Sequence, residues 1–237
     1  MWDKKGTRYV IILGYQGKDQ KRRVLMKEPI ILTKENKHMQ VVEVKAYHLH
    51  DFNILAKFDT LCRLELIGGK IQDFKELGKL KNLCELKLGL VEVKEFTSIT
   101  ALQQITELSI SGNQNYLIPS ISKMHNLKQL SLDFCKIESL EGVENLQNLT
   151  SLSLGSVGED YEISEIMNLR NLKRLKLTIP RKQTQWETDL LLESFAENFP
   201  KLDWLELDMK GKEFKPYVLR NLHLRHFTVT STPFSFM

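Results

Sequence analysis

A chain of 237 residues, 42% hydrophobic and 27% charged, has the composition of a folded protein with room for one large domain or two small ones. Its formal net charge of +4 gives little reason to expect a nucleic-acid or membrane partner. Three cysteines do not make a disulfide framework, and since no secretory signal or membrane-spanning apolar stretch is visible, we expect a cytoplasmic protein.

The amino-terminal segment, residues 1–38, is basic. It contains ten Lys/Arg against four Asp/Glu and therefore carries +6, which leaves −2 for the rest of the chain. Within it, Arg8 to Leu13 and Arg22 to Met26 flank a turn around Gly14-Tyr15-Gln16-Gly17, and this arrangement predicts a β-hairpin. We expect the hairpin to cap the domain that follows.

From residue 39 onward the sequence repeats the apolar pattern L-x-x-L-x-L. The nine units span 39–232 and begin at residues 39, 61, 83, 105, 127, 149, 172, 202 and 224. In each unit an alternating x-L-x-L segment has the period of a strand with one buried face. The rest of the unit has apolar residues at every third position, which is typical of 3₁₀ turns, as in Ile71, Phe74, Leu77 and Leu80. Each unit is therefore predicted to be a coil with one short strand and a tight return.

Two segments depart from this regularity. The seventh unit is longer, and Thr184 followed by Glu187 forms a capping-box pattern before an apolar run that ends at Pro200, which predicts an α-helix. Its alternative is an exposed loop, Arg181 to Trp186, that touches a partner. After the last unit, residues 233–237 are too apolar for a solvated tail, and we expect them to cap the final coil.

The repeated pattern resembles the leucine-rich-repeat (LRR) family, and its 22-residue unit is similar to the short-repeat subclass typified by a phosphatase regulatory subunit. The resemblance implies an α/β right-handed solenoid, with a curved parallel sheet on the concave face and 3₁₀ or irregular turns and one α-helix on the convex face. The family usually places Asn or Cys at the ninth position of each unit. Here only Asn113 and Cys135 comply, so we expect the turns to be less uniform.

Repetition makes the concave face the largest continuous surface of such a solenoid, so we expect partner contacts at outward strand positions. These positions are charged in the first three units and small and polar in the next three, and Trp204 is our main candidate for a binding hot spot. Its alternative roles are packing under the seventh coil or stacking on Arg174. The predicted partner-binding residues are Arg63, Glu65, Glu85, Lys87, Glu107, Ser109, Gln129, Ser131, Asp133, Ser151, Ser153, Arg174, Lys176, Trp204, Glu206 and Asp208.

Catalytic and metal-binding patterns are weak in this sequence. The nearest metal pattern is His48-x-His50 beside Asp51, without a cysteine nearby in sequence, and structural histidines explain it better. Gly68-Gly69 follows a strand without a phosphate-binding motif, so these glycines are expected to relieve crowding in a turn. Cys62 and Cys84 occupy the same slot of adjacent units, as two thiols or as a bridge. We expect no enzymatic activity, no cofactor and no small-molecule substrate.

The sequence therefore predicts a non-enzymatic module that binds a protein partner on its concave face. One alternative is an immunity or inhibitor protein that occludes a toxin or an enzyme. A second is a binder of polyanions, nucleic acid or another acidic surface, through the basic segment 1–38; the mixed charges of the concave face make nucleic acid an improbable ligand there.

Overall fold

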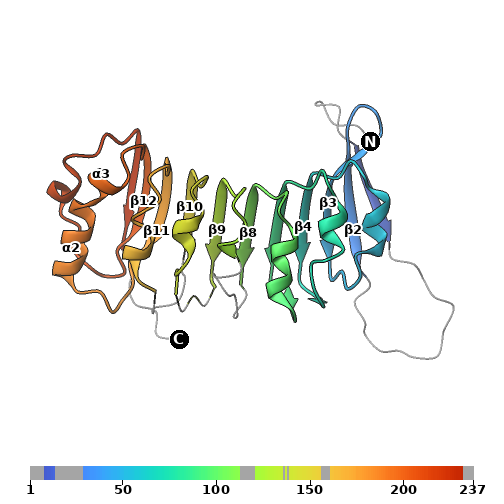
Figure 1. Ribbon diagram of the computed structural model, residues 1–237, viewed down its shortest axis with the longest axis horizontal. Helices are drawn as coiled ribbons and strands as arrows, with labels where there is room; N and C mark the ends of the chain where they lie inside the picture. The colour runs from blue at the N-terminus through green and yellow to red at the C-terminus, as the bar shows by residue number, and fades with distance from the viewer. Residues whose placement is uncertain are drawn as a thin grey trace. The chain divides into compact units, whose positions relative to one another are not determined.

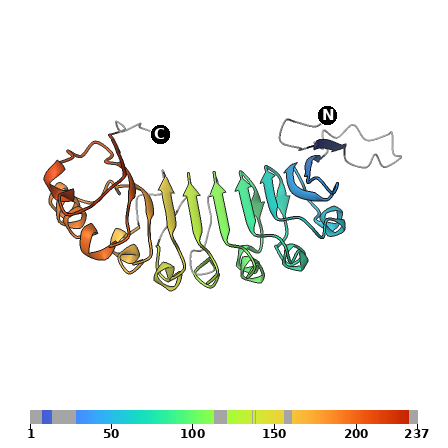
Figure 2. The same cartoon turned by 90° about the horizontal axis from the view of Figure 1, so that it is seen from above.

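The computed structural model describes residues 8–13 (backbone only), 29–112, 121–135, 137, 139–155 and 161–231. The chain divides into two compact units, Met1–Ile105 and Thr106–Met237. Each unit is built from coils in which a short strand alternates with a return segment. Figure 2 shows, in each unit, the strands along one side and the returns along the other.

The first unit begins with two antiparallel pairings and continues with parallel ones. Strand β1 pairs with β2, and β2 with β3, in antiparallel fashion, whereas β3, β4 and β6 are parallel neighbours. A separate small parallel sheet joins β5 to β7. The elements are β1 (Arg8–Leu13), β2 (Ile30–Glu35), β3 (Val41–Tyr47), η1 (Asn53–Lys57), β4 (Arg63–Ile67), β5 (Lys70–Ile71), η2 (Leu77–Lys79), β6 (Glu85–Gly89), β7 (Glu92–Val93) and η3 (Phe96–Ala101).

The second unit is parallel throughout its described sheet, in the order β8-β9-β10-β11-β12-β13. Figure 1 shows α2 and α3, in orange, beside strand β12. The elements are β8 (Glu107–Ser111), β9 (Gln129–Asp133), η4 (Val143–Asn145), β10 (Ser151–Gly155), η5 (Ile163–Ile166), β11 (Arg174–Thr178), α2 (Gln185–Glu193), α3 (Phe195–Asn198), β12 (Trp204–Asp208), η6 (Pro216–Leu219) and β13 (His226–Thr230).

The repeated leucines form the core because the strands of successive repeats pair in register, so that equivalent leucines lie side by side. Leu152 lies opposite Leu130 on one side and Leu175 on the other, and all three side chains are at most 2% exposed. The apolar residues of the returns are buried in the same way, and Leu55, Leu77 and Ile99 sit in the predicted 3₁₀ turns. The predicted coil of one strand and one 3₁₀ return is thus confirmed.

The amino-terminal end differs from the predicted hairpin in its pairing. Strand β1 has β2, Ile30–Glu35, as its antiparallel partner, whereas the predicted second strand, residues 22–26, lies outside the described residues. Strand β2 also pairs with β3 of the first coil and buries Ile31 and Thr33. The edge of the first coil is therefore covered by β2, which the sequence pattern did not single out. The expected carboxy-terminal cap, residues 233–237, also lies outside the described residues.

The helix predicted for the seventh repeat is confirmed, together with its capping box. The Thr184 hydroxyl accepts the Glu187 backbone N–H at 3.2 Å, and a Glu187 carboxylate oxygen accepts the Thr184 backbone N–H at 2.7 Å. These two hydrogen bonds satisfy donors that the first turn of a helix leaves without partners. Trp186 belongs to this first turn, so the segment from Arg181 to Trp186 is only partly a loop.

Side-chain amides link successive coils at a position that the sequence analysis missed. Asn82, Asn148 and Asn171 each precede the first leucine of a unit, and each donates its amide to a carbonyl of the preceding coil at 2.8 Å. At the ninth position, Cys135 makes longer contacts with the carbonyls of Ile110 and Asp133, while Asn113 lies outside the described residues. The coils thus use a different asparagine ladder from the one usual in the family.

Candidate functional site

The strand side chains that point away from the core form what we call the open face of each unit. It consists of the outward strand positions that the sequence predicts for partner binding, and we describe it separately for the two units. Arg63, Glu65, Glu85 and Lys87 belong to the open face of the first unit, on β4 and β6. The remaining predicted residues belong to the open face of the second unit, on β8 to β12.

Charges on the open face of the first unit neutralise one another. One series of contacts runs from Lys34 through Glu43, Arg63 and Glu85 to Lys87, with N–O distances between 2.7 and 3.9 Å. A further pair joins Lys45 to Glu65 at 2.8 Å, and its hydrogen bond raises the pKa of Lys45. A partner that covered this surface would have to desolvate charges that already have counterions. We therefore expect this surface to contribute little binding energy.

On the first three strands of the second unit, the central outward side chains are small and polar and protrude little from the sheet. Ser109, Ser131 and Ser153 are in register on β8, β9 and β10. Ser131 donates a hydrogen bond to Asp133 at 3.0 Å, and the other carboxylate oxygen of Asp133 lies over Gly155, where a β-carbon would come within 2.0 Å. These strands let a partner's backbone approach closely, whereas they offer few side chains that could anchor it.

Trp204 is the largest side chain on the open face of β11, β12 and β13. It is half-buried, and its ring stacks on that of His226 with centroids 5.0 Å apart and an interplanar angle of 12°. The two residues are register partners on β12 and β13, whereas Arg174 lies opposite Trp204 on β11. The stacking partner is therefore His226 and not Arg174, which corrects the alternative raised from the sequence. Stacking holds the indole in place before any partner arrives.

Among the described charged side chains on the open face around Trp204, all but one have an ionic partner. Lys176 lies 3.8 Å from Glu206, and Lys210 lies 3.0 Å from Asp208. His226 is 3.9 Å from Glu206. Arg174 is exposed and has no ion pair with any residue that the structure describes. A partner carboxylate could therefore reach Arg174 without first displacing a described counterion.

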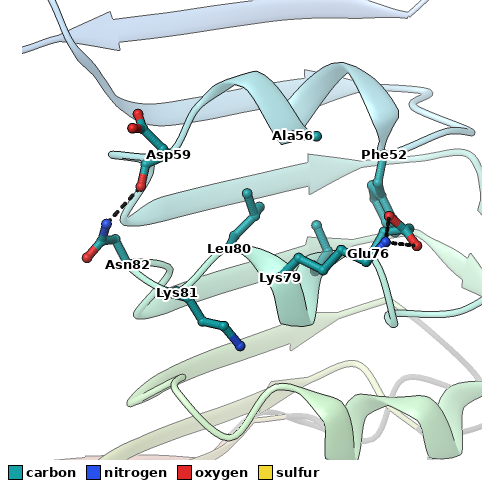
Figure 3. Close-up of a pocket in the computed structure, with 9 residues that line it drawn as sticks. Phe52, Ala56, Asp59, Glu76, Lys79, Leu80, Lys81 and Asn82 are labelled. Atoms are coloured by element: carbon teal, nitrogen blue, oxygen red, sulfur yellow. Dashed lines mark hydrogen bonds and ion pairs between the residues drawn. The ribbon is translucent and has the colours of Figure 1, made fainter.

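A groove of about 400 Å³ lies on the return side of the first unit, between η1 and η2 (Figure 3). Its apolar lining comes from Phe52, Ala56, Leu77 and Leu80. On its rim Lys79 pairs with Glu76 at 2.7 Å, and the amide of Asn82 donates to a backbone carbonyl. Its lining contains no cysteine, histidine or serine, so the groove offers an apolar contact with a charged rim and no thiol, hydroxyl or imidazole group.

The residues considered for chemistry make structural contacts in the described parts of the chain. His50 contacts the carbonyl of Lys70 at 3.2 Å, and no group of three or more His, Cys, Asp or Glu there could hold a metal ion. Gly68 has a left-handed φ of 62°, and a β-carbon on it would lie 2.9 Å from the His48 ring, which confirms that glycine relieves crowding. Cys62 and Cys84 are free thiols, and each donates to a backbone carbonyl of the preceding coil.

A buried tyrosine also escaped the sequence analysis. Tyr161 is 1% exposed, its hydroxyl donates to the carbonyl of Thr178, and burial raises the pKa of the phenol. Its place in the core and its single carbonyl partner indicate a packing role. Within the described residues no helix combines the length and the apolar character that crossing a membrane requires.

Comparisons with known proteins agree with this architecture. An internalin, InlF, from Listeria monocytogenes is 21% identical, with a TM-score of 0.60; the match covers 79% of this chain and 53% of that one. The chain thus spans about half the length of that internalin. Internalin C2 from the same organism is also 21% identical, with a TM-score of 0.59, and the match covers 80% of this chain and 81% of the other. These structures share the fold.

Curated protein sequences gave no match. A family model described as a leucine-rich repeat region matches residues 38–237, which includes every coil described above. The chain therefore belongs to the leucine-rich-repeat family.

Proposed function

We propose that this chain is a non-enzymatic module that binds a protein partner on the open face of β11, β12 and β13, with Trp204 and Arg174 as anchors. Leucine-rich-repeat proteins generally mediate protein–protein interactions, and this general property supports the class of function. The observation that carries the position is the stacked, half-buried Trp204 beside the exposed Arg174.

Three properties favour this part of the surface. Trp and Arg are enriched among residues that dominate binding energy, and stacking on His226 fixes the indole, so that less side-chain entropy is lost on binding. Arg174 can pair with a partner carboxylate, whereas Lys176, Glu206 and Asp208 already have counterions. The neighbouring strands β8 to β10 carry serine at their central outward positions, Ser109, Ser131 and Ser153, so the partner can lie close to the sheet there.

The experiment is affinity capture from the native organism, with quantitative mass spectrometry of the proteins retained. Wild type is compared with the double variant Trp204→Ala/Arg174→Ala and with Lys87→Ala, a control on the open face of the first unit. We expect the double variant to lose the captured partner and the control to retain it. Retention of every partner by the double variant would contradict the proposed face.

An inhibitor or immunity protein is a special case of the same binding mode, in which the captured partner is a toxin or an enzyme. Addition of the chain to that purified partner distinguishes the two. Loss of its activity in proportion to the chain added supports occlusion, and unchanged activity supports a scaffold.

A further inference from the structure

Helices α2 and α3 carry an exposed stripe that lies apart from the open face. We call Trp186, Leu190, Glu193 and Glu197 the helix stripe. Trp186 is 71% and Leu190 54% exposed, and both glutamates are exposed. Spacings of four, three and four residues place these side chains within an arc of roughly 60° on one side of a helix.

The junction between the two helices keeps the stripe continuous. Ser194 has helical dihedral angles, φ −76° and ψ −11°, and its carbonyl accepts the backbone N–H of Asn198 at 3.1 Å. The helical direction therefore continues from α2 into α3, and Glu193 and Glu197 follow Leu190 along the same side.

The other sides of α2 are occupied. Thr188 and Leu192 are buried against the coil. Towards η6, the side chain of Gln185 exchanges two hydrogen bonds with the backbone of Glu213, and Asp189 pairs with Lys215 at 2.6 Å. The hydrogen bond from Lys215 lowers the pKa of Asp189. The helix is thus fixed on two sides. The stripe lies opposite the buried side and next to the η6 side, since Glu193 follows Asp189 by one helical turn.

Charge divides the stripe into two halves. Trp186 and Leu190 form an apolar half, one helical turn long. Glu193 and Glu197 form an acidic half, and neither makes an ion pair with a residue that the structure describes; Arg170 reaches only the backbone carbonyl of Glu197, at 3.4 Å. A ligand that matches both halves must be apolar at one end and basic at the other.

We propose that the helix stripe docks an amphipathic helix of another protein, which places two apolar side chains on Trp186 and Leu190 and two Lys or Arg on Glu193 and Glu197. Such a helix carries its apolar pair and its basic pair along one face, at the spacing of the stripe. The partner helix can run parallel or antiparallel to α2. The two directions differ only in whether its apolar pair or its basic pair comes first in its sequence. Charge complementarity selects this occupant over a second copy of the chain, whose stripe would present glutamates.

The test uses two synthetic helical peptides of about 20 residues and isothermal titration calorimetry. Both carry two leucines one turn apart, followed on the same face by two lysines in one peptide and by two glutamates in the other. We expect the lysine peptide to bind wild type at least about tenfold more tightly than the glutamate peptide. Trp186→Ala should weaken the lysine peptide at least about tenfold, and Glu193→Lys/Glu197→Lys should reverse the preference between peptides.

The matched control is Arg220→Ala, which removes an exposed charge of the eighth coil outside the stripe and should leave both affinities unchanged. Circular dichroism melts establish that each variant is folded. The proposal is overturned if wild type does not bind the lysine peptide at about millimolar concentration, or if the charge reversal leaves the preference unchanged. It is also overturned if sedimentation shows a dimer that Trp186→Ala dissolves, because the occupant is then a second copy.

Discussion

In several repeats the eighth residue, just after the strand, has a left-handed backbone conformation, and this conformation predicts how substitutions there change stability. Gly68, Leu90, Gly112 and Phe134 share this slot and have φ of 62°, 54°, 70° and 54°. The left-handed conformation costs an L-residue about 1–2 kcal/mol, whereas glycine in a regular strand is about 0.5–1 kcal/mol less favourable than alanine. Phe134 is 71% exposed, so glycine and alanine there remove nearly the same contacts, and their difference reports the backbone.

We therefore expect Phe134→Gly to have a higher free energy of unfolding than Phe134→Ala, by up to about 1 kcal/mol. At Gln129, an exposed residue of strand β9, the order should reverse, with Gln129→Ala more stable than Gln129→Gly by about 0.5–1 kcal/mol. Urea unfolding followed by far-ultraviolet circular dichroism measures all four variants. A glycine–alanine difference of the same sign at both positions would refute the reasoning.

Three further predictions follow from other parts of the structure. Leu152→Ala should lower the free energy of unfolding by about 2–5 kcal/mol in urea titrations, because the side chain is 1% exposed; a loss under about 1 kcal/mol would contradict the stacked core. The Thr184 backbone N–H lowers the pKa of Glu187, so wild type should be more stable than Glu187→Gln at neutral pH and lose this advantage as the pH falls below about 4; a difference that persists at pH 2 would contradict the capping box. If the +6 of residues 1–38 binds polyanions, affinity for heparin should fall at least about a thousandfold between about 50 and about 200 mM salt, whereas an equally steep fall for the captured protein partner would contradict binding through Trp204.

The coil itself could be predicted from the sequence because its determinants are local and repeated. A leucine such as Leu130 or Leu152 recurs in the same slot, and alternation within five residues already says which side is buried. The helix of the seventh unit was predictable for the same reason, since Thr184 and Glu187 are only three residues apart. Local signals of this kind do not depend on how the coils are placed.

Other features had a signal that was not used. The asparagine ladder is written in the sequence as Asn before the first leucine of a unit, at Asn82, Asn148 and Asn171. Likewise Trp204 and His226 both occupy the third position of their units, so the slot alignment alone brings them side by side. Strand β2 appears as the apolar run Ile30-Ile31-Leu32, which belongs to no unit and therefore escaped a search for repeats.

Exposure and charge pairing on the open face could not be predicted, because they depend on which rotamer each long side chain adopts. The pattern of charges at Arg63, Glu85 and Lys87 predicts neighbours but not that one series of ion pairs joins them. The same limit applies to Arg174. Glu206 lies on the adjacent strand, two residues along from the position opposite Arg174, yet it is Lys176 that approaches this carboxylate. These choices reflect differences of a few tenths of a kcal/mol to about 1 kcal/mol between exposed ion pairs.

The central claim is that a protein partner binds the open face of β11 to β13 through Trp204. Its most direct test is isothermal titration calorimetry of the purified captured partner with wild type and with Trp204→Ala. Trp204 is half-buried, so a melting curve of the variant provides the control for folding. We predict that Trp204→Ala weakens the affinity about 30-fold or more, which corresponds to about 2 kcal/mol, and an affinity within about twofold of wild type would contradict the account.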